Sequence, residues 1–118
     1  MKVDIYKMSG VTIVKPHGDI RVKTVVPLRS NLEALDDEQV RKVAIDLEEV
    51  AFVDSSGVGL LANFAKRLNQ RQGSMALFNY SADVKELLDV TGLEQAMGIH
   101  DDLDQMLAAM TDGGNEAS

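Results

Sequence analysis

The sequence predicts an α/β fold, because short apolar runs typical of strands alternate with longer stretches of helical periodicity. The clearest strand is Val43–Leu47, an apolar run typical of a buried strand. The clearest helix follows it, where Leu61, Phe64 and Leu68 recur at helical spacing. The 118 residues, 45% of them hydrophobic, fit one domain with a packed core.

The N-terminal segment predicts a pair of antiparallel strands. Val3–Tyr6 alternates apolar and polar residues, which indicates a strand with one exposed face. Ser9-Gly10 is a turn, and Val11–Pro16 is the second strand, which returns antiparallel to the first. Residues 17–21 follow as a loop.

The first helix is predicted after this loop. Thr24 can cap it, and Pro27 is tolerated in its first turn. Its buried stripe consists of Val25, Leu28, Leu32 and Leu35. Three consecutive acids, 36–38, end this helix as a solvated connection to the strand 43–47.

The second half of the chain continues the alternation. The helix that contains Leu61 runs to about Gln72, and a fourth strand covers 75–78. Ser81 caps a third helix that stops at Gly92, residues 98–100 form a short edge strand, and Asp102 caps a last helix. The inner positions of these two helices are Val84, Leu87, Leu88, Thr91, Leu103, Met106, Leu107 and Met110. We expect residues 1–110 to form the domain and 111–118 a flexible C-terminal tail.

Composition excludes several classes of function. The absence of cysteine excludes disulfides, thiolate catalysis and cysteine-bound metal. The net charge of -7 argues against nucleic-acid partners, and the aromatic content of 4% offers no stacking platform for single strands. No apolar run approaches a membrane span and no signal-peptide layout begins the chain, so we expect a cytoplasmic protein without direct membrane insertion.

The segment Val53–Gly59 (VDSSGVG) lies where a strand-derived loop turns into a helix. Asp and Ser cap such an N-terminus, because their oxygens accept hydrogen bonds from its free N–H groups. Gly57 and Gly59 weaken the helix, but they leave its first turn without bulk, so that another molecule can approach the backbone. Taken alone, Asp-Ser-Ser-Gly is also what an ordinary connection contains.

In its context, this segment indicates more. The longer string 43–61, VAIDLEEVAFVDSSGVGLL, resembles the pattern of the STAS family of anti-sigma factor antagonists, and the resemblance extends over Val3–Met110. It implies a single STAS-like domain, with a small mixed sheet of four to five strands and helices packed mainly on one face. In the family the second serine of the pair is phosphorylated, which corresponds to Ser56 here.

The resemblance implies a phosphorylatable protein-binding switch. The unphosphorylated protein would bind a serine kinase that is also an anti-sigma factor. That kinase would phosphorylate it with ATP held by the kinase itself, and a phosphatase would reset it. The implied partner-binding residues are Asp19, Arg21, Asp54, Ser55, Ser56, Gly57, Val58 and Gly59.

Two other binding functions stay open. STAS domains also serve as accessory subunits of lipid-transport ABC transporters and as scaffold subunits of stress-signalling assemblies. The family usually has Gly-Glu-Leu-Asp in the loop before the first helix, whereas this chain has Gly18-Asp19-Ile20-Arg21. Arg21 therefore reverses a charge near the expected phosphorylation site, which keeps these alternatives open.

Nothing in the sequence favours catalysis. The two histidines, His17 and His100, share no local motif with a serine or an acid. The string VDSSG lacks the leading glycine of a nucleophile elbow, and no phosphate-binding Gly-Lys-Ser/Thr triplet occurs. No His or acid pair has metal-ligand spacing. We expect a protein that is not an enzyme and holds no cofactor or metal.

Overall fold

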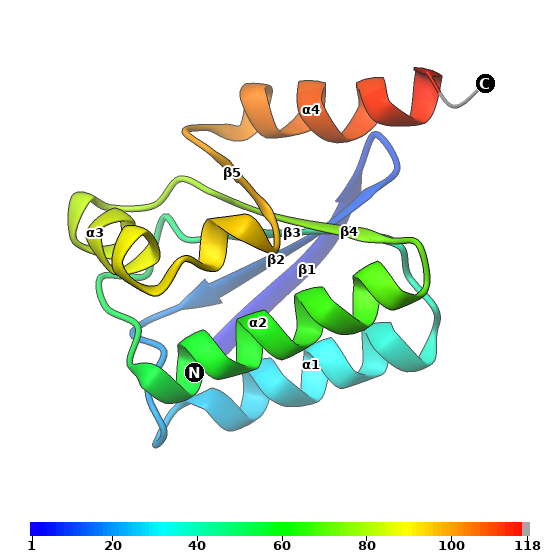
Figure 1. Ribbon diagram of the computed structural model, residues 1–118. Coiled ribbons are helices and arrows are strands. Elements are labelled where there is room, and N and C mark those ends of the chain that lie inside the picture. Colours follow the sequence, from blue (N-terminus) through cyan, green and yellow to red (C-terminus); the bar gives the residue numbers. More distant parts are fainter. Residues whose placement is uncertain (117–118) are drawn as a thin grey trace.

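A computed structural model describes residues 1–116 of the chain. A five-stranded mixed sheet forms its centre (Figure 1). Its strands are β1 (Lys2–Met8), β2 (Val11–His17), β3 (Lys42–Asp46), β4 (Ser74–Phe78) and β5 (Gly98–His100). β1 pairs antiparallel with β2, and the other neighbours pair in parallel, so the spatial order follows the chain order.

Helices cover the sheet unequally. They are α1 (Val25–Asp37), α2 (Ser55–Gln70), α3 (Ala82–Thr91), the 3-10 turn η1 (Leu93–Gln95) and α4 (Leu103–Glu116). The first three helices share the larger hydrophobic core with one sheet face, while α4 packs alone on the other, as Figure 1 shows. This arrangement confirms the predicted α/β fold with its mixed sheet and its helices mainly on one face. None of the helices in residues 1–116 is long and apolar enough to cross a membrane.

The two cores follow from the alternation of side chains along the strands. In β3, Val43 and Ile45 point to the face of α1 and α2, whereas Ala44 points to the face of α4. On the α4 side, Met106 is fully buried. The larger core therefore lies beneath the helix that carries the serine motif.

The backbone of α4 extends beyond residue 110, where the sequence analysis ended the domain. The helical backbone of α4 continues through Thr111–Glu116, a stretch assigned to a flexible tail that began at residue 111. Once a helix exists, each added residue gains a hydrogen bond at little further cost, so weak helix formers can extend it. The Thr111 hydroxyl also donates to the Leu107 carbonyl over 2.6 Å. Residues 117 and 118 of the predicted tail lie outside the described residues.

The predicted helix caps differ in outcome. Ser81 accepts a hydrogen bond from Val84 N, and Asp102 accepts one from Gln105 N, as expected. Thr24 precedes α1, but its hydroxyl accepts no hydrogen bond from that helix. It instead accepts from Arg21 N over 3.0 Å and donates to the Asp19 carbonyl over 2.6 Å. Thr24 thus closes the loop before α1, so the prediction that it caps the helix was wrong.

Candidate functional site

The serine motif lies at the N-terminus of α2, beyond the carboxyl end of β3. Asp54 is the capping residue, and its Oδ1 accepts hydrogen bonds from Ser56 N over 3.0 Å and Gly57 N over 3.1 Å. The same oxygen accepts a hydrogen bond from the Ser56 hydroxyl over 2.6 Å. The hydrogen bond from the Ser56 hydroxyl is the main cause that holds the pKa of Asp54 below its ordinary value, and the backbone hydrogen bonds lower it further. Asp54 is therefore an ionised carboxylate, and in this form it orients the Ser56 hydroxyl.

The loop before α1 packs beside this motif. Ile20 forms an isolated parallel bridge with Val53. The Ile20 carbonyl accepts a hydrogen bond from Asp54 N over 2.9 Å. The second carboxylate oxygen of Asp54 accepts a hydrogen bond from Val22 N over 3.0 Å. These contacts bring the loop that carries Arg21 beside the serine motif. Asp54 is the residue that joins them.

Arg21 has partners within its own surface region. Its guanidinium pairs with Asp19 over 3.3 Å and lies over the Phe52 ring, 4.2 Å from the ring centroid. Phe52 is 43% exposed, which is unusual for so large an apolar side chain. The sequence analysis did not select Phe52; an aromatic residue in a loop just before the motif was the available signal. Arg21 and Phe52 together form an exposed stacked pair beside the motif.

The two serines differ in environment. Ser55 is exposed, whereas Ser56 is half-buried and bonded to Asp54. Val58 and Gly59 are also half-buried. Apart from the buried Gly57, the predicted motif residues are at least partly accessible, as are Asp19 and Arg21 on the neighbouring loop.

Gly57 serves the fold rather than the surface. A Cβ atom at this position would lie 2.7 Å from Ile20 Cγ2 and 2.7 Å from Val53 Cγ1, far inside van der Waals contact. The absence of a side chain lets α2 begin against the bridge between those two residues. At Gly59 a Cβ atom would meet nothing within 4 Å. The idea that both glycines open the backbone to another molecule is thus corrected for Gly57.

A polar groove of about 330 Å³ runs between α1 and α2 and reaches Ser56. It is lined by Arg29, Glu33, Ser56, Gly59, Leu60, Asn63 and Arg67. The sequence analysis identified only the buried stripe of α1 and missed Arg29, which lies on the exposed side of that helix. Arg29 shares this groove with Ser56, because α1 and α2 lie side by side (Figure 1).

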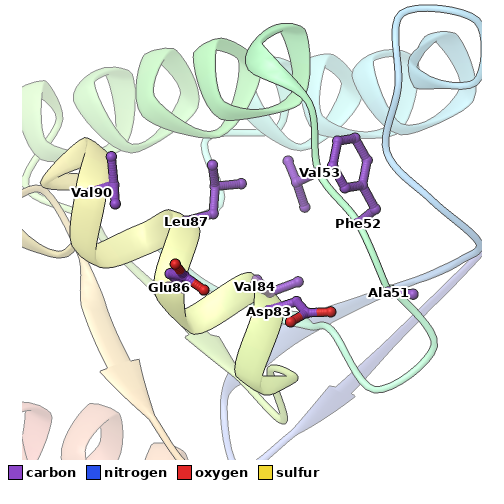
Figure 2. A pocket seen from close by; sticks show the side chains of 8 residues that line it. All are labelled: Ala51, Phe52, Val53, Asp83, Val84, Glu86, Leu87 and Val90. Atoms are coloured by element: carbon purple, nitrogen blue, oxygen red, sulfur yellow. The ribbon is translucent and has the colours of Figure 1, made fainter.

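A second, mainly apolar groove of about 440 Å³ lies between the segment before the motif and α3. Figure 2 shows its lining, which comprises Ala51, Phe52, Val53, Asp83, Val84, Glu86, Leu87 and Val90. Val90 is 79% exposed. Of the predicted inner positions of α3, Val84 and Leu88 are buried and Leu87 is half-buried, but Thr91 is exposed, so that position was predicted wrongly. Two carboxylates, Asp83 and Glu86, stand beside these apolar side chains. This groove adjoins the motif through Val53.

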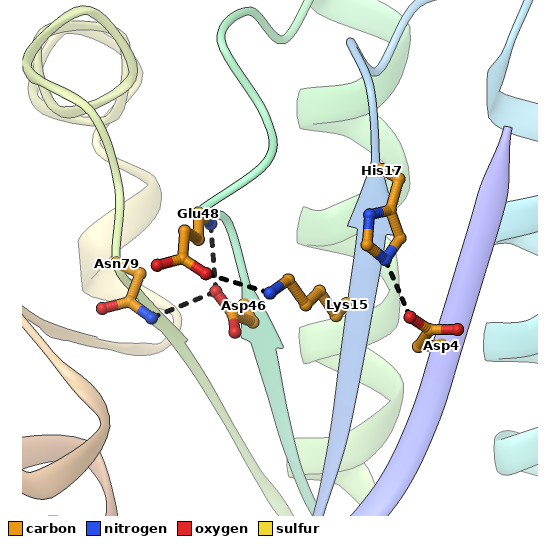
Figure 3. A network of polar contacts seen from close by, with 6 residues as sticks. All are labelled: Asp4, Lys15, His17, Asp46, Glu48 and Asn79. Carbon is orange, nitrogen blue, oxygen red and sulfur yellow. Dashed lines mark hydrogen bonds and ion pairs between the residues drawn. The ribbon is translucent and has the colours of Figure 1, made fainter.

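The polar contacts at the carboxyl ends of β2 and β3 connect neighbouring strands and loops with one another (Figure 3). His17 Nε2 lies 2.8 Å from a carboxylate oxygen of Asp4, so this ring faces an acid rather than a serine. The bond with His17 is the main cause that lowers the pKa of Asp4. Asp46 is only 4% exposed, and it accepts hydrogen bonds from Glu48 N and the Asn79 amide. Among the side chains of residues 1–111, no group of three or more His, Cys, Asp or Glu residues could hold a metal ion.

Comparison with known proteins identifies the family. The family model described as STAS domain matches residues 2–106, which is most of the chain. The chain belongs to the STAS family. This STAS domain is 31% identical over 102 residues to the anti-sigma F factor antagonist of Paenibacillus polymyxa, which covers 86% of this chain and 87% of that protein.

Solved structures share the fold of this STAS domain. An anti-sigma factor antagonist from Mycobacterium paratuberculosis superposes with a TM-score of 0.84 at 24% identity, covering 92% of both chains. The Bacillus cell fate determinant SpoIIAA in its phosphorylated form gives 0.69 at 17% identity, covering 99% of this chain and 100% of that one. At identities this low, the superpositions establish the shared fold alone. The site must be argued from its own residues.

Proposed function

We propose that this STAS domain is an anti-sigma factor antagonist whose binding is switched by phosphorylation of Ser56. The observation that carries the proposal is the placement of Ser56 at an accessible helix N-terminus, with its hydroxyl oriented by Asp54. The 31% identical relative that bears this name supports it. The STAS family is a regulatory family, and the proposal assigns the protein no enzymatic activity.

The unphosphorylated surface is what the partner would recognise. It consists of the exposed Ser55, the half-buried Ser56, Val58 and Gly59, and the adjoining Asp19 and Arg21. Asp54 and Gly57 support this surface from below, one by hydrogen bonds and the other by close packing. A cytoplasmic serine kinase that is also an anti-sigma factor fits this role, because binding and phosphorylation then involve the same residues.

The chemistry of the switch belongs to the kinase. The Ser56 Oγ–P bond forms as the bond between the γ-phosphorus and the β-bridging oxygen of kinase-bound ATP breaks. The hydroxyl proton must leave to a base. Asp54 is a poor candidate for that base, since its pKa is lowered by the bonds it already accepts. The kinase would therefore supply the base and the magnesium ions, and a phosphatase would hydrolyse the phosphoserine to reset the switch.

The test is phosphopeptide mapping after incubation with the cognate kinase and ATP. We expect the label on Ser56, full loss of label in Ser56→Ala, and retained label in the matched control Ser55→Ala. Label that persists in Ser56→Ala would contradict the site. A protein that binds its native partners without ever being labelled would instead favour a scaffold or transporter-accessory role.

A further inference from the structure

Three features around Ser56 indicate which side chain binds a phosphate carried by that residue. The first is the hydrogen bond that the Ser56 hydroxyl donates to Asp54 over 2.6 Å. Phosphorylation removes this hydrogen and adds about -1.5 to -2 charges at neutral pH. Two anions at this distance repel each other. The phosphorylated side chain must therefore turn away from Asp54.

The second feature is the groove that lies open to Ser56. Arg29 of α1 and Ser56 of α2 line the same 330 Å³ space, together with the Asn63 amide. Arg29 is exposed and takes part in no ion pair with the side chains of residues 1–111. Arg67, the other cation of the groove, is already paired with Asp36 over 3.1 Å. Glu33 is the only acid in the lining and lies one helical turn beyond Arg29.

The third feature is that Arg21, another arginine near Ser56, already has partners. Arg21 is on the neighbouring loop, but its guanidinium pairs with Asp19 and stacks on Phe52. To reach a phosphate it would have to give up both contacts. Arg29 has no such contact to lose, and its planar donors suit the oxygens of a phosphate.

We propose that Arg29 is the phosphate-positioning residue of this STAS domain, which draws the phosphoserine into the groove between α1 and α2. The proposal rests on the proposed function, because it takes Ser56 as the modified residue. The phosphate would then be held at the helix pair and away from the loop of Arg21. In that position Arg29 shields the phosphate from hydrolysis and so prolongs the released state.

The test uses the full chain with phosphoserine installed at position 56 during synthesis, so that it does not depend on any kinase. Phosphorus NMR then follows the titration of the phosphoserine in the wild type, Arg29→Gln, Arg29→Lys and the matched control Arg21→Gln. We expect the phosphate to lose its second proton at a lower pH in the wild type and Arg21→Gln than in Arg29→Gln. Arg29→Lys should lie between them, since it keeps the charge but not the fork of donors.

Release of the phosphate by alkaline phosphatase provides a second readout. Removal of an exposed ion pair should speed release by roughly two- to fivefold in Arg29→Gln, and high salt should reduce the difference. Titration and release unchanged by Arg29→Gln would overturn the proposal, as would an effect confined to Arg21→Gln. A failure of kinase labelling at Ser56 would refute the proposed function alone, since neither readout involves the kinase.

Discussion

Gly57 and Gly59 stand two positions apart in the first turns of one helix, yet their surroundings are opposite. Gly57 is packed against Ile20 and Val53, which are themselves buried and branched at Cβ. Gly59 faces open space beside the groove. The fold therefore requires glycine at position 57, whereas at position 59 the packing leaves room for a side chain. We propose that the second glycine leaves room for a binding partner.

Alanine at each position separates these two roles. Gly57→Ala should lower the free energy of unfolding by about 1–2 kcal/mol, because overpacking costs more than the gain in helix propensity. Gly59→Ala should raise it by up to about 1 kcal/mol and weaken binding to the partner, whose approach it obstructs. Denaturant unfolding and calorimetric titration with the partner measure both quantities. Equal stability of the two variants would contradict this account of Gly57.

At the scale of elements, hydrophobic periodicity predicted the strands and helices because it reports directly on burial. β3, α2 and β5 lie within a few residues of their expected positions. Contacts between distant segments were beyond this reasoning. The bridge between Ile20 and Val53, the packing of Gly57 and the position of Arg29 all depend on how two loops and two helices meet in space. The sequence thus located the motif, and only the structure showed which of its residues support it.

The link between the loop after β4 and the turn before α4 provides a prediction about pH. The Tyr80 hydroxyl donates to Asp101, and this bond, with burial as a smaller cause, raises the pKa of Tyr80 to about 12. A raised folded-state pKa means that the contribution to stability is present below pH 10 and is lost as pH rises toward about 12. Ultraviolet titration of the two tyrosines should show one late step.

Tyr80→Phe should abolish the late step, and Tyr6→Phe should retain it. Asp101→Asn should move it to lower pH, because the carboxylate that opposes ionisation is gone. A wild-type protein with a single tyrosine transition near pH 10 would refute the importance of this hydrogen bond.

At the scale of the whole molecule, phosphorylation should change binding much more than folding. A negative charge at a helix N-terminus is favourable by roughly 0.3–1 kcal/mol, and the nearby Asp54 offsets part of that gain. A partner shaped for a neutral hydroxyl meets a far larger penalty, since juxtaposed like charges cost several kcal/mol. The larger core lies beneath α2, so we expect the site to stay in place whether or not Ser56 is charged.

Ser56→Asp should therefore lose affinity for the partner by tenfold or more, at about 1.4 kcal/mol per factor of ten, while the thermal unfolding midpoint hardly changes. Ser55→Asp serves as the matched control, with the same added charge on the exposed neighbour. Calorimetric binding and thermal unfolding on one sample decide between the two cases. If Ser56→Asp unfolds many degrees lower and loses binding in proportion, the switch acts through the fold.

The order of the strands also bears on how the protein is made. Each strand of the sheet lies beside the strand that precedes it in the chain. A nascent chain that emerges from the ribosome can add each new strand to an edge that is already formed, without waiting for a distant segment. Ile20 and Val53 are both synthesised before α2, so the support beneath Ser56 can form while β4, β5 and α4 are still to come. The surface around Ser56 is thus among the first parts of the molecule that can become native.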